Sequence, residues 1–501
     1  YTLTIGNGSG FIDLAVVGGT TPLASLTLLG TGVNKLRGDL TSSGAIDLKG
    51  TSRATQLFHD VTMTTTDSRV LAGTVNGGTG TAAGSYDLVI SNGSGEINLG
   101  DIGAVIALRS MTLQGDGLNN LGTITTTVGY DLGALRETTL NVDTTYVNQN
   151  NQVILGRFTL GNGVTLTLGD GGSATISVVL IRGTASGTAS YVVINSLSTL
   201  TVAETIGTDI GTITVQNSGG VTFAGAVTVG TSITLTDTTD AATIAFNGAL
   251  VVPSLITAAE GYNLGINATA TAITNAVTFL NSGTLALGAS AGTQTYTGGF
   301  TATAPSVSTL KGTINSTNAA MVLGPVTLGA NTTLNSNATT NAGDISLGAV
   351  TLGSLTLTLQ TGNAISGADV SGTTVSGLGS LALQNIGGTV SFSGAVSPAS
   401  LTVPNTVVNV ALTGSSGTVT NAVTFSNTGT LVLGASGGTQ TYTGGLVASA
   451  PSTVTLNGTI NTTNAALTLD AFTLGSDVTL NANATDSTGL IKIGGITGAN
   501  H

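Results

Sequence analysis

The sequence has no cysteine and no tryptophan, and it carries little charge. The absence of cysteine excludes disulfides and thiolate metal sites. Charged residues make up 7% of the chain, against roughly 25% in an ordinary soluble domain, so a conventional globular core is not expected. The 40% hydrophobic content also argues against disorder, because disordered chains are charge-rich and poor in β-branched residues.

Basic residues are the scarcest charged class. The 11 Lys and Arg residues leave a net charge of −12 and form no cluster, so nucleic acid and anionic lipid are not expected partners. The longest apolar runs, such as residues 178–181, are far shorter than the ~20 residues of a membrane-spanning helix, so no transmembrane segment is expected. We expect a processed chain or part of a longer one, because the first residue is Tyr1 rather than Met.

Short strings of alternating apolar and polar residues are abundant. Leu3-Thr4-Ile5, Ile12-Asp13-Leu14 and Leu26-Thr27-Leu28 each place the apolar side chains on one face and the polar side chain on the other. Most of the 74 glycines stand at breaks between such strings, where tight corners need them. No long stretch has helical spacing, so the chain is predicted to be all-β.

Two internal repeats organise the chain. Residues 1–36 match residues 86–121 at an offset of 85, and residues 246–345 match 392–491 at an offset of 146. A coil of about 21 residues makes these offsets close to four and seven coils, which favours a solenoid whose duplications preserve whole turns. Phe11 becomes Glu96 and Val16 becomes Asp101 between copies, so both positions are predicted to face water.

The predicted fold is therefore an elongated parallel β-helix, a β-solenoid of about 21 residues per coil. We expect an N-terminal section, 1–200, and a C-terminal section, 201–501, that form one continuous rod. Nine of the 11 basic residues lie at or before Arg182, which distinguishes the first section. Tandem immunoglobulin-like sandwiches would explain the first repeat but not the second.

The string GNGSGFIDLAVVGGTTPLASLTL at 6–28, with SGGVTFAGAV at 218–227 and GGTVSFSGAV at 387–396, resembles the repeats of large bacterial surface proteins of the filamentous haemagglutinin and autotransporter type. The resemblance implies a right-handed parallel β-helix, export to the cell surface and a structural or adhesive role. No secretion domain, leader or anchor is visible, so the export route stays open.

Candidate catalytic residues are few. The best local group is His59, Asp60, Asp67 and Arg69, in HDVTMTTTDSR, and we expect these to be solvated polar residues on a strand and turn. Between Lys311 and Lys492 the acids have no base or histidine near them; they are Asp344, Asp369, Asp470, Asp477 and Asp486. No catalytic residue, cofactor site or metal site is predicted, and the chain is not expected to be an enzyme.

Four further patterns have alternative interpretations. Asp170, in LGDGGSA, is similar to a calcium-binding turn, but an ordinary Asp-Gly corner is favoured. Arg37-Gly38-Asp39 spells an integrin-type tripeptide, which also arises by chance. The threonine arrays at 62–67 and 123–127 raise ice binding, but they do not recur in every coil, which favours a solvated β-face. Tyr296 and Tyr442 could stack on sugars; covering a coil edge is the preferred hypothesis.

These features favour an extracellular structural protein, located at the bacterial cell surface, that forms a fibre, filament or sheath by end-to-end or lateral association. The expected partner is another copy or the continuation of a longer chain. The alternative is a surface adhesin or carbohydrate-binding module that recognises cell-surface glycans. A polysaccharide-degrading enzyme is the third hypothesis.

Overall fold

A computed structural model describes residues 1–146, 152–184, 187–207, 209–362 and 367–498. These residues form strands and turns and no helix, and successive coils stack in parallel about 22 residues apart, about 22 turns in all. The predicted fold class, a parallel β-solenoid, is confirmed. The chain divides into two compact units, Tyr1–Ala245 and Phe246–His501, which we describe separately. The sections 1–200 and 201–501 remain a prediction from repeats and charge.

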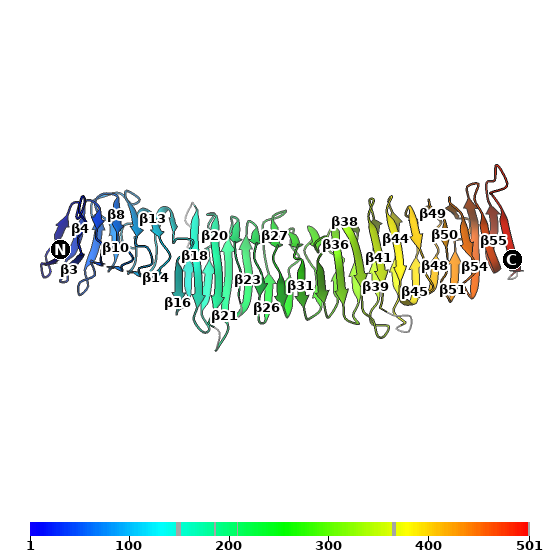
Figure 1. Ribbon diagram of the computed structural model, residues 1–501, viewed down its shortest axis with the longest axis horizontal. Coiled ribbons are helices and arrows are strands. Elements are labelled where there is room, and N and C mark those ends of the chain that lie inside the picture. Colours follow the sequence, from blue (N-terminus) through cyan, green and yellow to red (C-terminus); the bar gives the residue numbers. More distant parts are fainter. Residues whose placement is uncertain (147–151, 185–186, 208, 363–366, 499–501) are drawn as a thin grey trace. The chain divides into compact units, whose positions relative to one another are not determined.

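Unit 1 contains the strands that run from blue to green in Figure 1. The first of them are β1 (Thr2–Gly6), β2 (Ile12–Leu14), β3 (Ser25–Leu29), β4 (Val33–Leu36), β5 (Leu40–Thr41), β6 (Ile46–Asp47), β7 (Ala54–Leu57), β8 (Val61–Thr64), β9 (Val70–Ala72), β10 (Val75–Gly77), β11 (Asp87–Ser91), β12 (Ile97–Leu99) and β13 (Leu108–Gln114). The others are β14 (Leu118–Leu121), β15 (Thr126–Asp131), β16 (Glu137–Leu140), β17 (Thr144–Tyr146), β18 (Val153–Leu160), β19 (Thr165–Leu168), β20 (Ile176–Gly183), β21 (Ser190–Ser196), β22 (Leu200–Val202), β23 (Ile210–Ser218), β24 (Val221–Phe223), β25 (Val227–Thr228) and β26 (Ser232–Leu235).

Strand β27 (Thr243–Phe246) includes the unit boundary, and unit 2 contains the strands after it. These begin with β28 (Leu250–Val252), β29 (Ser254–Thr257), β30 (Asn263–Ile266), β31 (Ala270–Ile273), β32 (Val277–Thr278), β33 (Thr284–Leu287), β34 (Thr293–Tyr296), β35 (Phe300–Ala302), β36 (Val307–Ser316), β37 (Met321–Leu323), β38 (Val326–Asn335), β39 (Ile345–Leu347), β40 (Val350–Thr351) and β41 (Thr356–Gln360). They continue with β42 (Val370–Gly372), β43 (Val375–Ser376), β44 (Ser380–Gln384), β45 (Ile386–Phe392), β46 (Val396–Ser397), β47 (Ser400–Thr402), β48 (Val407–Leu412), β49 (Ser416–Val419), β50 (Val423–Thr424), β51 (Thr430–Leu433), β52 (Thr439–Tyr442), β53 (Leu446–Ala448), β54 (Thr453–Thr462), β55 (Leu467–Asn481) and β56 (Ile491–Gly498).

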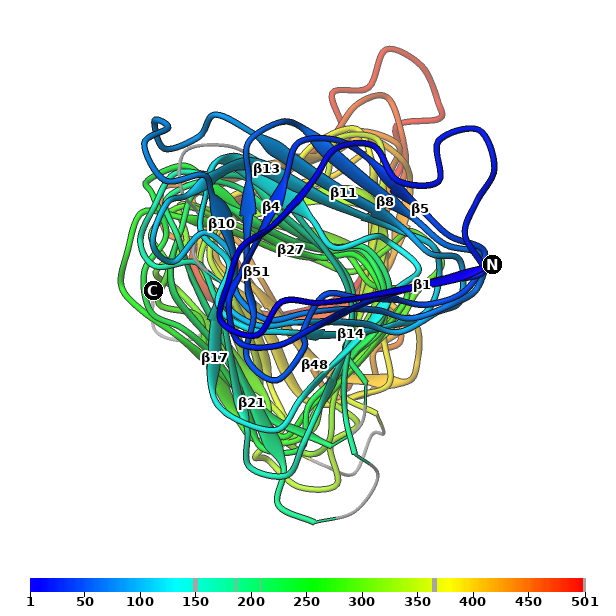
Figure 2. The same ribbon diagram turned by 90° about the vertical axis from the view of Figure 1, so that its left-hand side faces the viewer.

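Each coil has three sides, and each side pairs with the same side of the next coil. In the first coils of unit 1 the three ladders are β1–β3–β6–β9–β12, β2–β4–β7–β10 and β5–β8–β11. Figure 2 shows these coils, in blue, end-on as closed loops. Because the pairing is parallel and in register, every residue lies beside its counterpart in the neighbouring coil.

The alternating strings set the interior as predicted. Ile12, Leu14, Leu26 and Leu28 are each at most 9% exposed, whereas Phe11 and Val16 are each 62% exposed. Leu3 is 36% exposed, contrary to the prediction, because β1 pairs with another strand on one side only. The interior is a narrow aliphatic column whose burial contributes roughly 25 cal/mol per Å² of apolar surface.

The register shows that the repeats do not preserve whole turns, so that part of the sequence interpretation is wrong. The ladder from Leu3 passes Leu26, Ile46 and Val70, and Leu88, the copy of Leu3, lies two strands past Val70 on another side of the coil. In unit 2 the ladder from Leu264 ends its sixth coil at Val396, and the copy Val410 again lies two strands further on; the intermediate partners are Leu285, Ser308, Val326, Val350 and Val375. Each duplication is therefore turned by one third of a coil.

A strand with its corner is thus the unit that repeats, and a coil contains three of them. The coil length also varies, because Leu26 pairs with Ile46 at a step of 20 residues and Val70 pairs with Ile97 at a step of 27. The corners absorb this variation while the strands stay in register. An average of about 22 residues therefore conceals the shift between copies.

Glycine at a close corner gives the first testable prediction. Gly288 has a φ of +91°, and a Cβ there would lie 1.9 Å from the carbonyl oxygen of Lys311 in the next coil. Gly353 has a φ of +60°, and a Cβ there would have no atom within 4 Å. We expect Gly353→Ala to cost about 1–2 kcal/mol of unfolding free energy from backbone strain alone. Gly288→Ala should cost about 1–3 kcal/mol more, because the coils must separate.

Guanidinium unfolding of both variants, followed by circular dichroism, measures this difference. Equal losses in the two variants would show that the coils are not as closely stacked at this corner as the structure indicates.

Candidate functional site

The four residues that the sequence singles out as a catalytic candidate lie at two different corners. His59 and Asp60 precede β8, and Asp67 and Arg69 follow it. The His59 imidazole Nδ1 lies 3.0 Å from the backbone oxygen of Asp60 and is exposed. No hydrogen bond or ion pair joins the side chains of these four residues in the described part of the chain. The structure does not assemble them into one site.

Their carboxylates instead join coils. Asp60 Oδ1 accepts the backbone N–H of Asp87 at 2.9 Å, and Asp67 Oδ1 accepts that of Ser94 at 3.0 Å. The same arrangement, in which a corner Asp or Asn accepts an N–H from the next coil, recurs in both units; other acceptors are Asp39, Asp101, Asp143, Asn263, Asn331, Asp344, Asp369, Asn409 and Asn464. Charge-assisted bonds of this kind stabilise the stack of corners.

The tripeptide at 37–39 and Asp170 also lie at corners. Arg37 Nε donates to Asp13 Oδ1 at 2.9 Å, and Asp39 Oδ1 accepts the N–H of Thr62 at 2.7 Å, so both charged groups of the tripeptide already bond to neighbouring coils. Asp170 Oδ1 accepts the N–H of Gly172 at 3.2 Å, and Gly171 has a φ of +87°, as in an Asp-Gly corner. Among the described residues no group of three His, Cys, Asp or Glu side chains is placed to hold a metal ion.

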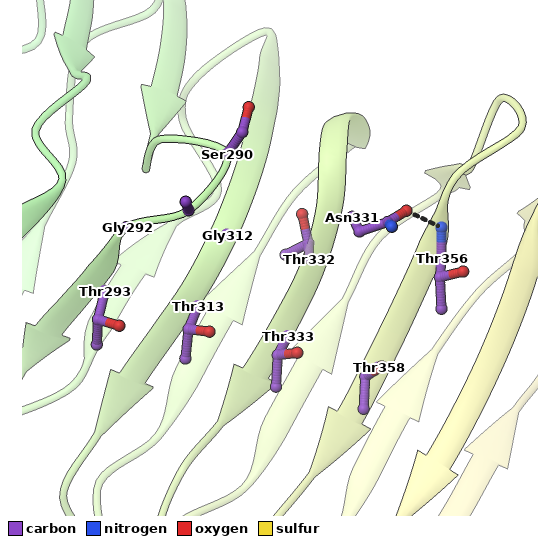
Figure 3. A pocket seen from close by; sticks show the side chains of 11 residues that line it. Ser290, Gly292, Thr293, Gly312, Thr313, Asn331, Thr332, Thr333, Thr356 and Thr358 are labelled. Carbon is purple, nitrogen blue, oxygen red and sulfur yellow. Dashed lines mark hydrogen bonds between the residues drawn. The ribbon is translucent and has the colours of Figure 1, made fainter.

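Threonines form columns on the outer face of unit 2. Register places Thr293 beside Thr313, Thr313 beside Thr333, and Thr333 beside Thr358, on β34, β36, β38 and β41. Figure 3 shows these side chains on successive strands, around a shallow hollow of about 410 Å³ with Asn331 and Thr356 at its rim. The hydroxyls of the four threonines make no hydrogen bond to any described residue.

The sequence analysis set ice binding aside because threonines did not recur in every coil, and that reason is wrong for this face. The recurrence is hidden in the sequence because the steps between these threonines are 20, 20 and 25 residues. The 146-residue duplication builds a second column, Thr439, Thr459 and Thr479, on another side of the coil. Ice binding itself is untested.

Tyr296 and Tyr442 lie in the interior, so neither covers a coil edge and neither is open to a sugar. They are 0% and 2% exposed. The Tyr296 ring lies 4.9 Å from the Phe300 ring, and its hydroxyl donates to Gln294 Oε1 at 2.9 Å. Gln294 Nε2 in turn donates to the Ile266 oxygen at 2.7 Å, and Gln440 with Tyr442 repeats the arrangement. The shared TQTY string therefore encodes a buried polar chain that links two coils.

Burial changes the acidity of the tyrosines. Loss of hydration raises the pKa of Tyr262 to about 12, and it raises the pKa of Tyr296 and Tyr442 further above the usual 10. The pKa values of Tyr130 and Tyr146 are raised for the same reason. These hydroxyls remain protonated through the neutral range.

Two buried arginines were missed by the sequence analysis. Arg53 is 0% exposed, and its guanidinium donates to Asn34 Oδ1 at 2.6 Å and to backbone oxygens in two preceding coils. These oxygens belong to Gly8, Gly10, Leu29 and Val33. No carboxylate of the described chain pairs with this guanidinium. Its five N–H groups satisfy corner carbonyls that have no other partner inside the stack.

Arg136 repeats this arrangement one duplication later. It donates to Asn119 Oδ1, and also to the oxygens of Gly93, Gly95, Gln114 and Leu118. Burial lowers the pKa of Arg136 to about 10, partly offset by Asp116, so the guanidinium is charged at neutral pH. The signal was present in the sequence, because Asn34 and Arg53 both have counterparts in the second copy, Asn119 and Arg136.

No family model, curated protein or solved structure matches this chain. The part of the chain that the structure describes contains no helix long and apolar enough to span a bilayer. Function must therefore be inferred from the residues themselves.

The buried arginine yields a second prediction. Arg53→Met should lower the unfolding free energy by about 3–5 kcal/mol, because several buried carbonyls lose their only donor. Arg53→Lys should also destabilise the chain, since an ammonium has three donors and no planar fork. The matched control is Arg37→Met at an exposed ion pair, where about 0–1 kcal/mol is expected. Denaturant unfolding measures all three; a neutral Arg53→Met would contradict this role.

The buried tyrosines yield a third prediction, in alkali. An unfolded tyrosine ionises near pH 10, whereas the buried tyrosines keep their protons to higher pH. Above pH 10 the unfolded state releases protons that the folded state retains, so the unfolding free energy falls as the pH rises. Each buried tyrosine adds up to about 1.4 kcal/mol per pH unit to this slope.

Unfolding at pH 8 to 11.5 measures the slope. The double variant Tyr296→Phe/Tyr442→Phe should show a shallower one, although it is less stable at pH 8 because Gln294 and Gln440 lose a donor. An unchanged slope would mean that these two hydroxyls ionise in the folded chain.

Proposed function

We propose that this chain is an extracellular structural protein of the bacterial cell surface, of the filamentous haemagglutinin or autotransporter-passenger type. It forms a fibre, filament or sheath. The observation that supports this is the use of the side chains: in each unit the large aromatics and two of the arginines lie in the interior or at the corners. The side chains that could do chemistry are thus used to hold coils together.

The exposed charges support the same proposal. Ion pairs join different coils: Arg37 pairs with Asp13, Arg109 with Asp87, and Arg157 with Glu204 at 3.0 Å. All are at least partly exposed, so each contributes little alone, but they clamp one coil to another. A long stack gains from such clamps at every step.

The edge of β56 is a surface that further material would cover. This strand pairs with β55, and Ile491, Ile493 and Ile496 on it are between 38% and 59% exposed. An open strand edge with exposed apolar side chains favours pairing with another strand. More coils of a longer chain, or a second copy, would supply that strand.

Electron microscopy and sedimentation velocity of the purified chain test the proposal, which is the fourth prediction. Particles that lengthen as the protein concentration rises are expected. Ile493→Lys, on the edge strand, should shorten them, because it places a charge on the surface to be covered. Molecules that stay single at every concentration would count against self-association.

A second candidate function, a carbohydrate-binding surface module, is favoured by the threonine hollow of Figure 3, whose hydroxyls have no partner in the described chain. Screening glycans with the wild type and with Thr313→Val/Thr333→Val distinguishes the two. Glycan binding that the variant loses, without assembly, would favour the module.

A further inference from the structure

The outer face of the first copy carries a cluster of rings and cations, which we name the cationic cluster: Phe11, Lys35, Arg37 and Phe58. The Lys35 ammonium lies 4.1 Å from the centre of the Phe11 ring and 5.7 Å from that of Phe58. The Arg37 guanidinium carbon lies 4.8 Å from the Phe58 ring. Arg37 pairs with Asp13, whereas the Lys35 ammonium has no carboxylate partner among the described residues.

The second copy has the same internal framework. In the first copy, Ile12 pairs with Asn34, and Asn34 pairs with Thr55. In the second, their counterparts Ile97, Asn119 and Thr138 pair in the same register on β12, β14 and β16. Asn34 Nδ2 donates to the Leu48 oxygen at 2.9 Å, and Asn119 Nδ2 donates to the Leu132 oxygen at 3.2 Å. The buried arginine is also repeated, so the coil below the outer face is the same in both.

The outer face of the second copy is different at every position of the cluster. Phe11 is replaced by Glu96, Lys35 by Asn120, Arg37 by Gly122 and Phe58 by Asn141, and Val16 is replaced by Asp101. Where the long side chains are missing, the structure has a hollow of about 410 Å³, which we name the acidic hollow. Asp101, Asn120, Gly122, Asn141 and Asp143 are among its lining residues.

The two surfaces are complementary in charge. The cationic cluster has two cations beside one carboxylate, Asp13, whereas the acidic hollow has two carboxylates, Asp101 and Asp143, and no cation in its lining. One oxygen of each of these carboxylates accepts a backbone N–H, from Thr123 and Thr165. Their second oxygens have no partner in the described chain, so they can accept from an ammonium or a guanidinium.

We propose that the cationic cluster of one molecule docks into the acidic hollow of a second copy. This rests on the proposed function, because it names the contact through which copies associate laterally. The rings would fill the space that the duplication opened, and Lys35 would meet the free carboxylate oxygens. The two surfaces are different patches of the same unit, so the contact is heterologous, and repetition of it gives an open chain of molecules rather than a closed dimer.

Exchange of residues between the copies tests this contact, because each framework already carries the residues that its counterpart would receive. Lys35→Asn/Phe58→Asn gives the first copy the outer residues of the second and removes the cluster. Asn120→Lys/Asn141→Phe gives the second copy those of the first and fills the hollow. Lys311→Asn, in unit 2, is the control for the loss of one cation.

Sedimentation velocity should show that each double variant alone associates only at a concentration roughly tenfold or more above that of the wild type. An equimolar mixture should form dimers and nothing larger, because one partner supplies an intact cluster and the other an intact hollow. Raising the salt concentration should weaken both the dimers and the wild-type assemblies. The Lys311→Asn control should assemble as the wild type does.

Two results would overturn the contact. One is assembly of either double variant at the wild-type concentration, and the other is a mixture that stays monomeric while the wild type assembles. In both cases the wild type still forms long particles, so the proposed function would stand and only this interface would fail. Wild-type molecules that never associate would overturn both.

Discussion

A strand in either unit satisfies its backbone by pairing with the strand one coil before it and the strand one coil after it, since no helix is present among the described residues. This requirement keeps the strands in register and aligns residues of one kind into columns. One column of hydroxyls follows the outer face of unit 2 from β36 to β46; it consists of Thr309, Thr327, Thr351, Ser376 and Ser397. A simple composition is sufficient for such a chain, because each position has to match only its neighbours above and below.

Corners carry the burden that the strands do not. Coil steps range from 20 to 27 residues, as the pairs Leu26 with Ile46 and Val70 with Ile97 show, so the corners must differ in length while their backbone groups remain bonded. Side chains that accept or donate several bonds do this work: Asp and Asn accept N–H groups from the next coil, and Arg53 donates to oxygens from two coils. Most of the polar residues that a sequence reader would inspect for chemistry are therefore corner residues.

The strand class, the inward positions and the corners could be predicted from the sequence because each depends on local pattern. Ile12, Leu26 and Leu28 alternate with polar residues, and this alternation alone fixes their direction. The places of Arg53 and Tyr296 could not be predicted, because the groups that accept from or pack against them lie one to two coils away. The threonine hollow was missed for the same reason: unequal steps hide a column that pairing between coils makes continuous.

The one-third turn of the duplications shows that the three sides of a coil are interchangeable. Each side is an alternating strand closed by a polar corner, so a copy that begins on another side still places its apolar residues inward; Leu88 is buried although it lies on a different ladder from Leu3. Since the interior constrains only the inward residues, the outward ones are free to change. Phe11, Lys35 and Phe58 could become Glu96, Asn120 and Asn141 with Asn34 and Arg53 kept as Asn119 and Arg136 beneath them. A solenoid built in this way acquires two unlike surfaces from one ancestral segment, and the turn between copies points these surfaces in different directions. Such surfaces cannot close on each other within the molecule, so their contact has to be made between molecules, and that geometry extends an assembly.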